Sequence, residues 1–232
     1  MNTLFARKIA WQLACAALLA GGCSSSIPTS EETHGYVDEA QKTLADFMRD
    51  PQMTWLQSHV QEARAVMVSP RILQAGFVIG GSGGEMLVIS RSQSGGWNGP
   101  AFYKMGSGSI GLQAGAQETQ MVALVMNEKA LHSLLSTSFK LGGDVSIAAG
   151  PIGAGAGRPV TSDIVTFTRN KGLYGGINLD GTVITVDSGK NQAYYGRAAT
   201  PVDILIEGRA TNPHSAGLTR TASAGVNAGP VK

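Results

Sequence analysis

Two glycine-rich segments are the features of this sequence that most resemble catalytic or cofactor-binding motifs. Residues 80–84 read Gly-Gly-Ser-Gly-Gly and fit Gly-x-Ser-x-Gly, the turn that presents a nucleophilic serine in hydrolases, which would be Ser82 here. That motif needs a strand before the turn and a helix after it, whereas a strand-like run follows residue 84. The sequence therefore predicts a hairpin turn over 80–84 rather than a catalytic serine.

The second segment, residues 106–111, fits Gly-x-Gly-x-x-Gly, the pattern of dinucleotide-binding loops. Such a loop opens a helix, but residues 112–115 (Leu-Gln-Ala-Gly) are a poor helix start. The four histidines show no metal-ligand spacing; they are His34, His59, His132 and His214. We therefore expect no catalytic residue, no metal site and no cofactor.

The N-terminus reads as a secretion signal. Arg7 and Lys8 precede a mostly apolar stretch, and three small residues precede Cys23. This pattern predicts a lipoprotein signal peptide over 1–22 and an acylated Cys23 as lipid anchor, since a lone free thiol is unusual in a secreted chain. Ser24 then favours the bacterial outer membrane, with the domain facing the periplasm or the cell surface. The alternative is ordinary signal cleavage nearby with a free Cys23.

Charge and composition further limit the classes of function that are possible. The chain has 18 Lys and Arg residues against 16 Asp and Glu, and the predicted leader contains two of the former, so the mature chain is formally neutral. Nucleic-acid binding normally needs a basic surface, so we expect no nucleic-acid partner. Glycine makes up 31 of 232 residues, nearly twice its usual share of about 7%.

Hydrophobic periodicity divides the mature chain into four parts. Residues 23–32 are small and polar, as in a tether; 33–64 have helical periodicity; 65–208 alternate short β-like runs with glycines; and 209–232 are expected to be a disordered tail. Helices followed by many adjacent strands predict an α+β fold, with a curved, partly closed, largely antiparallel glycine-rich sheet packed with N-terminal helices.

Within these parts the expected elements are short. The strands include 65–68, 74–80, 86–91, 108–116, 119–126, 144–149, 163–169, 173–179 and 182–187. Helices are expected at 33–49, 52–64, 127–136 (capped by Asn127), 191–195 and 201–207, and a turn at Asp180-Gly181.

Several blocks in a fixed order resemble the SYLF domain, a lipid-binding family of bacteria and of eukaryotic trafficking proteins. They are Ala75–Gly81, Gly95–Phe102, Gly108–Gly115, Leu141–Gly153, Arg169–Gly181 and Asn191–Gly196. The resemblance covers residues 60–207 and, more loosely, the helical lead-in, so that 33–208 is expected to form one SYLF-like domain. It implies non-catalytic binding of membrane phospholipid, with anionic lipids preferred.

A phosphate headgroup needs Arg or Lys together with free backbone N–H groups, which glycine turns can offer. Arg169, Lys171 and Gly172 meet that need, Lys140 and Arg158 are weaker candidates, and Tyr174 could line an interfacial surface. The alternative is that these charges are solvated at strand ends and that the aromatic residue is core.

Three functions remain for comparison. The first is a phospholipid-binding envelope lipoprotein, the second is a structural or assembly lipoprotein whose domain docks a protein partner, and the third is an enzyme using Ser82. An apolar cavity in the sheet would favour lipid, and a filled core with exposed apolar residues would favour a partner. The third needs an acid or base within reach of Ser82.

Overall fold

A computed structural model describes residues 27–153, 160–170 and 179–224. The helices are α2 (Ser30–Arg49), α3 (Thr54–His59), α4 (Glu128–Leu134), α5 (Ser188–Tyr195), the π-helix η2 (Val202–Ile206), the 3-10 helix η3 (Pro213–Ser215) and α6 (Ala216–Ser223). The strands are β1 (Ala65–Arg91), β2 (Trp97–Val125), β3 (Ser138–Lys140), β4 (Ile147–Ala149), β5 (Ile164–Asn170) and β6 (Val183–Val186).

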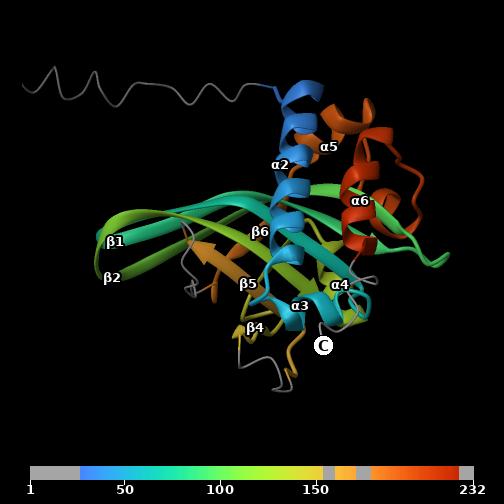
Figure 1. Ribbon diagram of the computed structural model, residues 1–232. Coiled ribbons are helices and arrows are strands. Elements are labelled where there is room, and N and C mark those ends of the chain that lie inside the picture. The colour runs from blue at the N-terminus through green and yellow to red at the C-terminus, as the bar shows by residue number, and fades with distance from the viewer. Residues whose placement is uncertain (1–26, 154–159, 171–178, 225–232) are drawn as a thin grey trace, which may run out of the picture.

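Strands β1 and β2 form a long antiparallel ribbon to which the rest of the sheet attaches (Figure 1). Their pairing runs from Ala65 opposite Val125 to Arg91 opposite Trp97, with irregularities at three places. The sheet order is β3-β6-β2-β5-β4, and β1 pairs with β2; among the described strand pairs, only β4–β5 is parallel. The sheet curls into a half-barrel, which confirms the predicted α+β class with a curved, largely antiparallel sheet.

The two faces of the sheet bury two separate apolar clusters, because successive side chains of a strand point to opposite faces. Met67, Val88 and Ala123 belong to the inner cluster, together with residues of α4 and η2. Val68, Leu87 and Val122 belong to the outer cluster, which α2, α3, α5 and α6 cover. Both faces at this end of the ribbon are therefore filled with buried side chains.

Helix α2 crosses the outer face (Figure 1), and a capping box fixes where it begins. The Thr29 hydroxyl accepts a hydrogen bond from Glu32 N at 3.1 Å, and the Glu32 carboxylate accepts one from Thr29 N at 2.8 Å. Val37, Leu44 and Phe47 lie on the buried face, as their spacing predicts. Among the described residues, no helix is both long enough and apolar enough to cross a bilayer.

Helix α5 is fixed to β2 through the fully buried side chain of Asn191. Its Oδ1 accepts a hydrogen bond from Phe102 N at 2.9 Å, and its Nδ2 donates to Phe102 O at 3.4 Å. Tyr195 donates its hydroxyl proton to Pro100 O at 2.8 Å. Asn191 and Tyr195, which carry the last block of the family resemblance, therefore have a structural role in the described residues.

The glycine-rich segment 80–84 is not a turn, so that prediction is wrong. It lies inside β1, paired with residues 105–109 of β2, and the separately predicted strands 65–68, 74–80 and 86–91 are one strand. The hairpin turn lies instead at 92–96, where Gly95 has φ +91°. Glycine permits a turn without requiring one, and cross-strand pairing keeps this segment extended. The predicted turn at Asp180-Gly181 is confirmed, with Gly181 at φ +80°.

The expectation of a disordered tail from residue 209 is also wrong for its first part. Residues 213–223 form η3 and α6, and Leu218 and Ala222 are fully buried in the outer cluster. This segment is ordered by packing against α2 and not by its own composition, which is rich in small residues. The tether is shorter than predicted, since α2 begins at Ser30, and α3 ends at His59 rather than near 64. The predicted strand 173–179 lies almost entirely outside the described residues.

Gly150 should not tolerate any side chain. A Cβ at this position would lie 2.2 Å from the ring of Phe167, which is fully buried against Trp55. We expect Gly150→Ala to lower the free energy of unfolding by about 2 kcal/mol or more, measured by urea denaturation. Gly96→Ala is the matched control, since no atom lies within 4 Å of a Cβ there. Equal effects of the two substitutions would contradict this packing.

Asp163 should contribute to stability only above acid pH. Hydrogen bonds from Asn127 and Ser146 hold the pKa of this carboxyl at about 2, and they join α4, β4 and β5. Because the folded-state pKa is lowered, the contribution is present above the unfolded pKa and is lost as pH falls toward 2. Asp163→Asn should therefore lower the unfolding free energy at pH 7, and the difference from the natural chain should shrink between pH 5 and pH 2. Glu62→Gln, at an exposed carboxylate, is the control.

Candidate functional site

The predicted binding residues fall into two groups in the structure. Lys140 and Arg169 are described, whereas the remaining residues lie outside the described ranges; these are Cys23, Arg158, Lys171, Gly172 and Tyr174. In the sheet order, β6 and β2 lie between β3, which carries Lys140, and β5, which carries Arg169. The structure therefore does not bring these two cations together on neighbouring strands.

Arg169 lies near the end of β5 and has partners within the protein. Its Nε and Nη2 donate to Gln120 Oε1 at 3.2 and 2.7 Å, and Nη2 lies 3.8 Å from Asp46 Oδ2. The guanidinium also sits 5.0 Å from the centroid of the Phe47 ring, and the side chain is only 20% exposed. Arg169 thus joins β5 to β2 and to the last turn of α2, which limits the donors left for a headgroup.

Lys140 is exposed and lies beside two tight turns that are joined by backbone hydrogen bonds. Leu141 N donates to Thr182 O and Gly181 N donates to Leu141 O, each at 2.9 Å. Gly142 has φ +76°, and a Cβ there would lie 2.6 Å from Asp180 Oδ1. The two glycine blocks that carry the strongest family resemblance therefore meet beside Lys140, so their glycines are required for close packing as well as for any backbone N–H donors.

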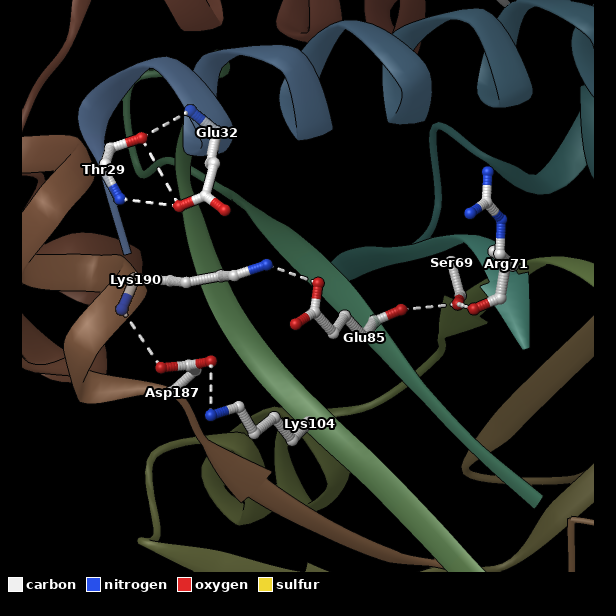
Figure 2. A network of polar contacts seen from close by, with 8 residues as sticks. All are labelled: Thr29, Glu32, Ser69, Arg71, Glu85, Lys104, Asp187 and Lys190. Carbon is white, nitrogen blue, oxygen red and sulfur yellow. Dashed lines mark hydrogen bonds and ion pairs between the residues drawn. The ribbon is translucent and has the colours of Figure 1, made fainter. Parts of the chain in front are cut away.

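A polar network that the sequence analysis missed lies beneath the start of α2 (Figure 2). Lys190 of α5 forms an ion pair with Glu85 of β1, and its ammonium lies 5.0 Å from the ring centroid of Tyr36. Asp187, almost fully buried, caps α5 by accepting from Lys190 N at 3.0 Å and lies 3.0 Å from Nζ of Lys104 on β2. The network joins α5, both strands of the ribbon and the aromatic face of α2.

Part of this network could be found in the sequence, and part could not. Asp is a common helix N-cap residue, so the capping role of Asp187, three residues before Lys190, could be predicted from the sequence. Glu85 lies opposite Lys104 only in the register that the β1–β2 ribbon adopts. That register could not be predicted, because the glycine-rich segment 80–84 resembles a turn in the sequence. Burial, followed by the negative charge of Glu85, raises the pKa of Tyr36, so its hydroxyl stays protonated at neutral pH.

The geometry around Ser82 does not match a nucleophile elbow. Ser82 lies within β1 opposite Ser107, and the two hydroxyls are hydrogen bonded at 2.7 Å. The motif's strand–turn–helix context is not present at this position. Within the part of the chain that the structure describes, no group of three His, Cys, Asp or Glu side chains could hold a metal ion.

Comparison with known proteins identifies the family that this chain matches. The family model described as "Ysc84: Las17-binding protein actin regulator" matches residues 106–225, just over half of the chain. An SH3 domain-containing protein of Schizosaccharomyces pombe is 28% identical over 207 residues, 84% of this chain and 47% of that protein. The protein YSC84 of Saccharomyces cerevisiae is 26% identical over 206 residues, 84% of this chain and 43% of its own length.

A human relative, SH3 domain-containing YSC84-like protein 1, is 24% identical over 140 residues, 58% of this chain and 41% of that protein. The chain thus spans about half the length of the relatives it matches, or less. The family and its relatives are named as binding or regulatory proteins and not as enzymes.

Truncating the two described cations should have different effects on folding. Arg169→Ala should lower the free energy of unfolding by about 1–2 kcal/mol, because it leaves Gln120 and Asp46 without their partner. Lys140→Ala should change it by about 0.5 kcal/mol or less, because this side chain is exposed. Urea denaturation of both variants measures the difference. A larger effect at Lys140 would contradict the placement of Arg169.

Proposed function

The chain belongs to the Ysc84 family, which includes the SYLF domain, and from this membership we propose that it is a non-catalytic phospholipid-binding lipoprotein of a bacterial envelope. In this proposal the acylated Cys23 anchors the protein in the outer membrane. The folded domain faces the periplasm or the cell surface and contacts anionic phospholipid headgroups.

The observation that carries the proposal is the small number of residues between Cys23, the proposed anchor, and the start of the folded domain. The capping box starts α2 at Ser30, so Cys23 precedes the cap residue Thr29 by only six residues. An extended chain spans at most about 3.3–3.6 Å per residue, which limits the tether to roughly 20 Å. A domain held this close to a bilayer meets headgroups at a high local concentration, so that weak contacts are sufficient for binding.

Exposure and charge support Lys140 as the more available of the two described candidates for a headgroup. It is exposed beside a pair of glycine turns, whereas Arg169 already has protein partners. Lys171 and Gly172 directly follow β5 in the sequence, and with Arg158 and Tyr174 they remain candidates for the same role. A phosphate group accepts hydrogen bonds from an ammonium, which Lys140 offers, whereas the backbone N–H groups of residues 140–144 and 181–182 already donate within the protein.

A second candidate function is docking of a protein partner, with the lipid anchor only placing the domain. Two observations favour it: the described interior of the half-barrel is filled with buried side chains, and several large apolar residues are exposed. The exposed residues are Ile27, Leu73, Val183, Val202 and Ile206. The family whose model matches this chain is also named for binding a protein, Las17.

Vesicle co-sedimentation separates the two functions. The mature chain with Cys23→Ser, which cannot be acylated, should sediment with vesicles containing phosphatidylglycerol and much less with pure phosphatidylcholine vesicles. Lys140→Ala together with Lys171→Ala should reduce the bound fraction several-fold, and more strongly at low salt, because exposed charges are screened. Lys42→Ala together with Lys129→Ala, two lysines placed elsewhere on the surface, is the matched control.

Failure of the unacylated chain to sediment with either vesicle would contradict headgroup binding. The anchor would then be the only membrane contact, and docking of a protein partner would become the leading function. Equal loss of binding in the control pair would show a general charge effect rather than a site at Lys140.

A further inference from the structure

A strip of exposed side chains crosses the sheet beside α5. Lys104 of β2 lies opposite Thr185 of β6, and Thr185 lies opposite Ser138 of β3. Val183 and Lys140 form the next cross-strand pair of β6 and β3. All five side chains are exposed, and Val183 is one of the few large apolar residues of the described chain that solvent reaches. We call these five residues the β6 strip.

Strand alternation places the β6 strip on the outer face of the sheet. Phe102, two residues before Lys104 on β2, belongs to the outer cluster, so Lys104 points to the same face. The residues between members of the strip are buried in the inner cluster; they are Met105, Phe139 and Ile184. Gly106 is the β2 partner of Val183, and a Cβ there would meet only the backbone oxygen of Ser82 within 4 Å. The helices that cover the outer cluster therefore leave this part of the outer face open.

The β6 strip presents two ammonium groups to solvent, and the acidic partner of one of them is buried. The side chain of Lys104 is 61% exposed, whereas that of Asp187, with which it forms an ion pair, is 4% exposed. Lys140 has no ion pair among the residues that the structure describes. Asp144 and Asp180 are exposed in the adjoining turns, so the strip is only weakly basic. Its attraction to anionic headgroups is therefore modest and gains from a second contact with the membrane.

The tether enters the described structure beside the β6 strip. A Cβ at Gly189, near the start of α5, would lie 3.6 Å from ring carbons of Pro28 and 3.4 Å from Asp187 Oδ1. Asp187 is in turn the ion-pair partner of Lys104 (Figure 2). Pro28 and the near end of the strip therefore lie at the same corner of the domain.

Chain length limits how far the proposed anchor can lie from the strip. Cys23 precedes Pro28 by five residues, which span roughly 18 Å at most. Lys140 is two strands and two residues away from Lys104, a Cα separation of about 12 Å at the usual strand spacings. The strip is thus shorter than the reach of the tether. A bilayer held by Cys23 is the occupant that the chain itself supplies for this surface.

We propose that the β6 strip lies against the bilayer that holds the anchor, with Lys104 and Lys140 among the phospholipid headgroups. This inference rests on the proposed function and deepens it by naming the surface that contacts the membrane and a second lysine that takes part. The hydroxyls of Ser138 and Thr185 lie between the two lysines and can donate to phosphate or ester oxygens. Long lysine side chains keep their ammonium groups in the headgroup layer, so Val183 between them can approach the apolar interior.

Lysine footprinting on tethered vesicles tests this orientation. The predicted mature chain has one cysteine, Cys23, whose thiol can be coupled to a maleimide-bearing lipid in vesicles that contain phosphatidylglycerol. Acetylation of Lys104 and Lys140 by an amine-reactive reagent, followed by mass spectrometry, should then be several-fold slower than in the chain capped with a soluble maleimide. Lys42 on α2 and Lys129 on α4 are exposed internal controls, and their rates should not change.

Carboxylates added to the strip test whether the contact depends on its surface chemistry. Thr185→Glu with Ser138→Glu places two negative charges between the lysines at exposed positions. This pair should abolish the protection of both lysines on tethered vesicles, because the carboxylates are repelled by the headgroups and lose water on contact. Thr54→Glu with Gln93→Glu adds the same charge at exposed positions outside the strip and should leave the protection unchanged. Each variant is compared with its own soluble-capped form, and circular dichroism checks that it is folded.

The other outcomes separate this inference from the proposed function. Unchanged labelling of the strip on tethered vesicles would overturn the orientation, and it would leave headgroup binding intact if the unacylated chain still sediments with phosphatidylglycerol vesicles. Protection in the soluble-capped chain that grows with protein concentration would show that a second copy covers the strip, which also overturns it. Protection of the strip on tethered vesicles without sedimentation of the unacylated chain would support the orientation and overturn independent headgroup binding.

Discussion

The antiparallel pairing of two very long strands is the constraint on which the rest of this structure depends. Strand alternation sends one set of side chains into the half-barrel and the other set toward α2, so a single ribbon organises two apolar clusters. The ribbon must also curl, and at Gly84 a Cβ would lie 2.7 Å from Arg71 O. The two halves of β1 can approach each other here only because this residue has no side chain. The curvature of the sheet therefore requires glycine where strand segments approach each other closely.

Polar contacts then fix the helices to this ribbon at specific points. Asn191 satisfies the backbone of Phe102, Lys190 pairs with Glu85, and Asp187 lies against Lys104. Because buried polar groups are costly when unpaired, these contacts admit few alternative positions for α5. They also connect the start of α2, and hence the proposed tether, to the ribbon. The positions of α5 and of the start of α2 on the ribbon are therefore set by a small number of side chains.

The sequence alone predicted the elements that depend on local patterns of residues. It failed where pairing between distant segments of the chain decides the structure. Helix α2 was predictable because Val37, Leu44 and Phe47 repeat at helical spacing. The glycines at 80–84 allow both a turn and an extended strand, and only their partners on β2 decide between them. Helix α6 is ordered by burial of Leu218 against other elements, which composition does not reveal. Among the candidate site residues, Lys140 was predicted as a weaker headgroup candidate and is exposed in the structure, whereas the contact of Arg169 with Gln120 depends on strand register.

The filled interior limits how this domain could handle lipid. Within the described residues, the inner face of the half-barrel is occupied by side chains such as Met67, Tyr103 and Ile184, each 1% exposed or less. An acyl chain could enter only by displacing them, at a cost of several kcal/mol in lost packing. Lipid contact would therefore occur at the outer surface, where headgroups and the interfacial layer of an intact bilayer are accessible. A filled interior suits a protein that adheres to a membrane surface better than one that extracts and carries a lipid.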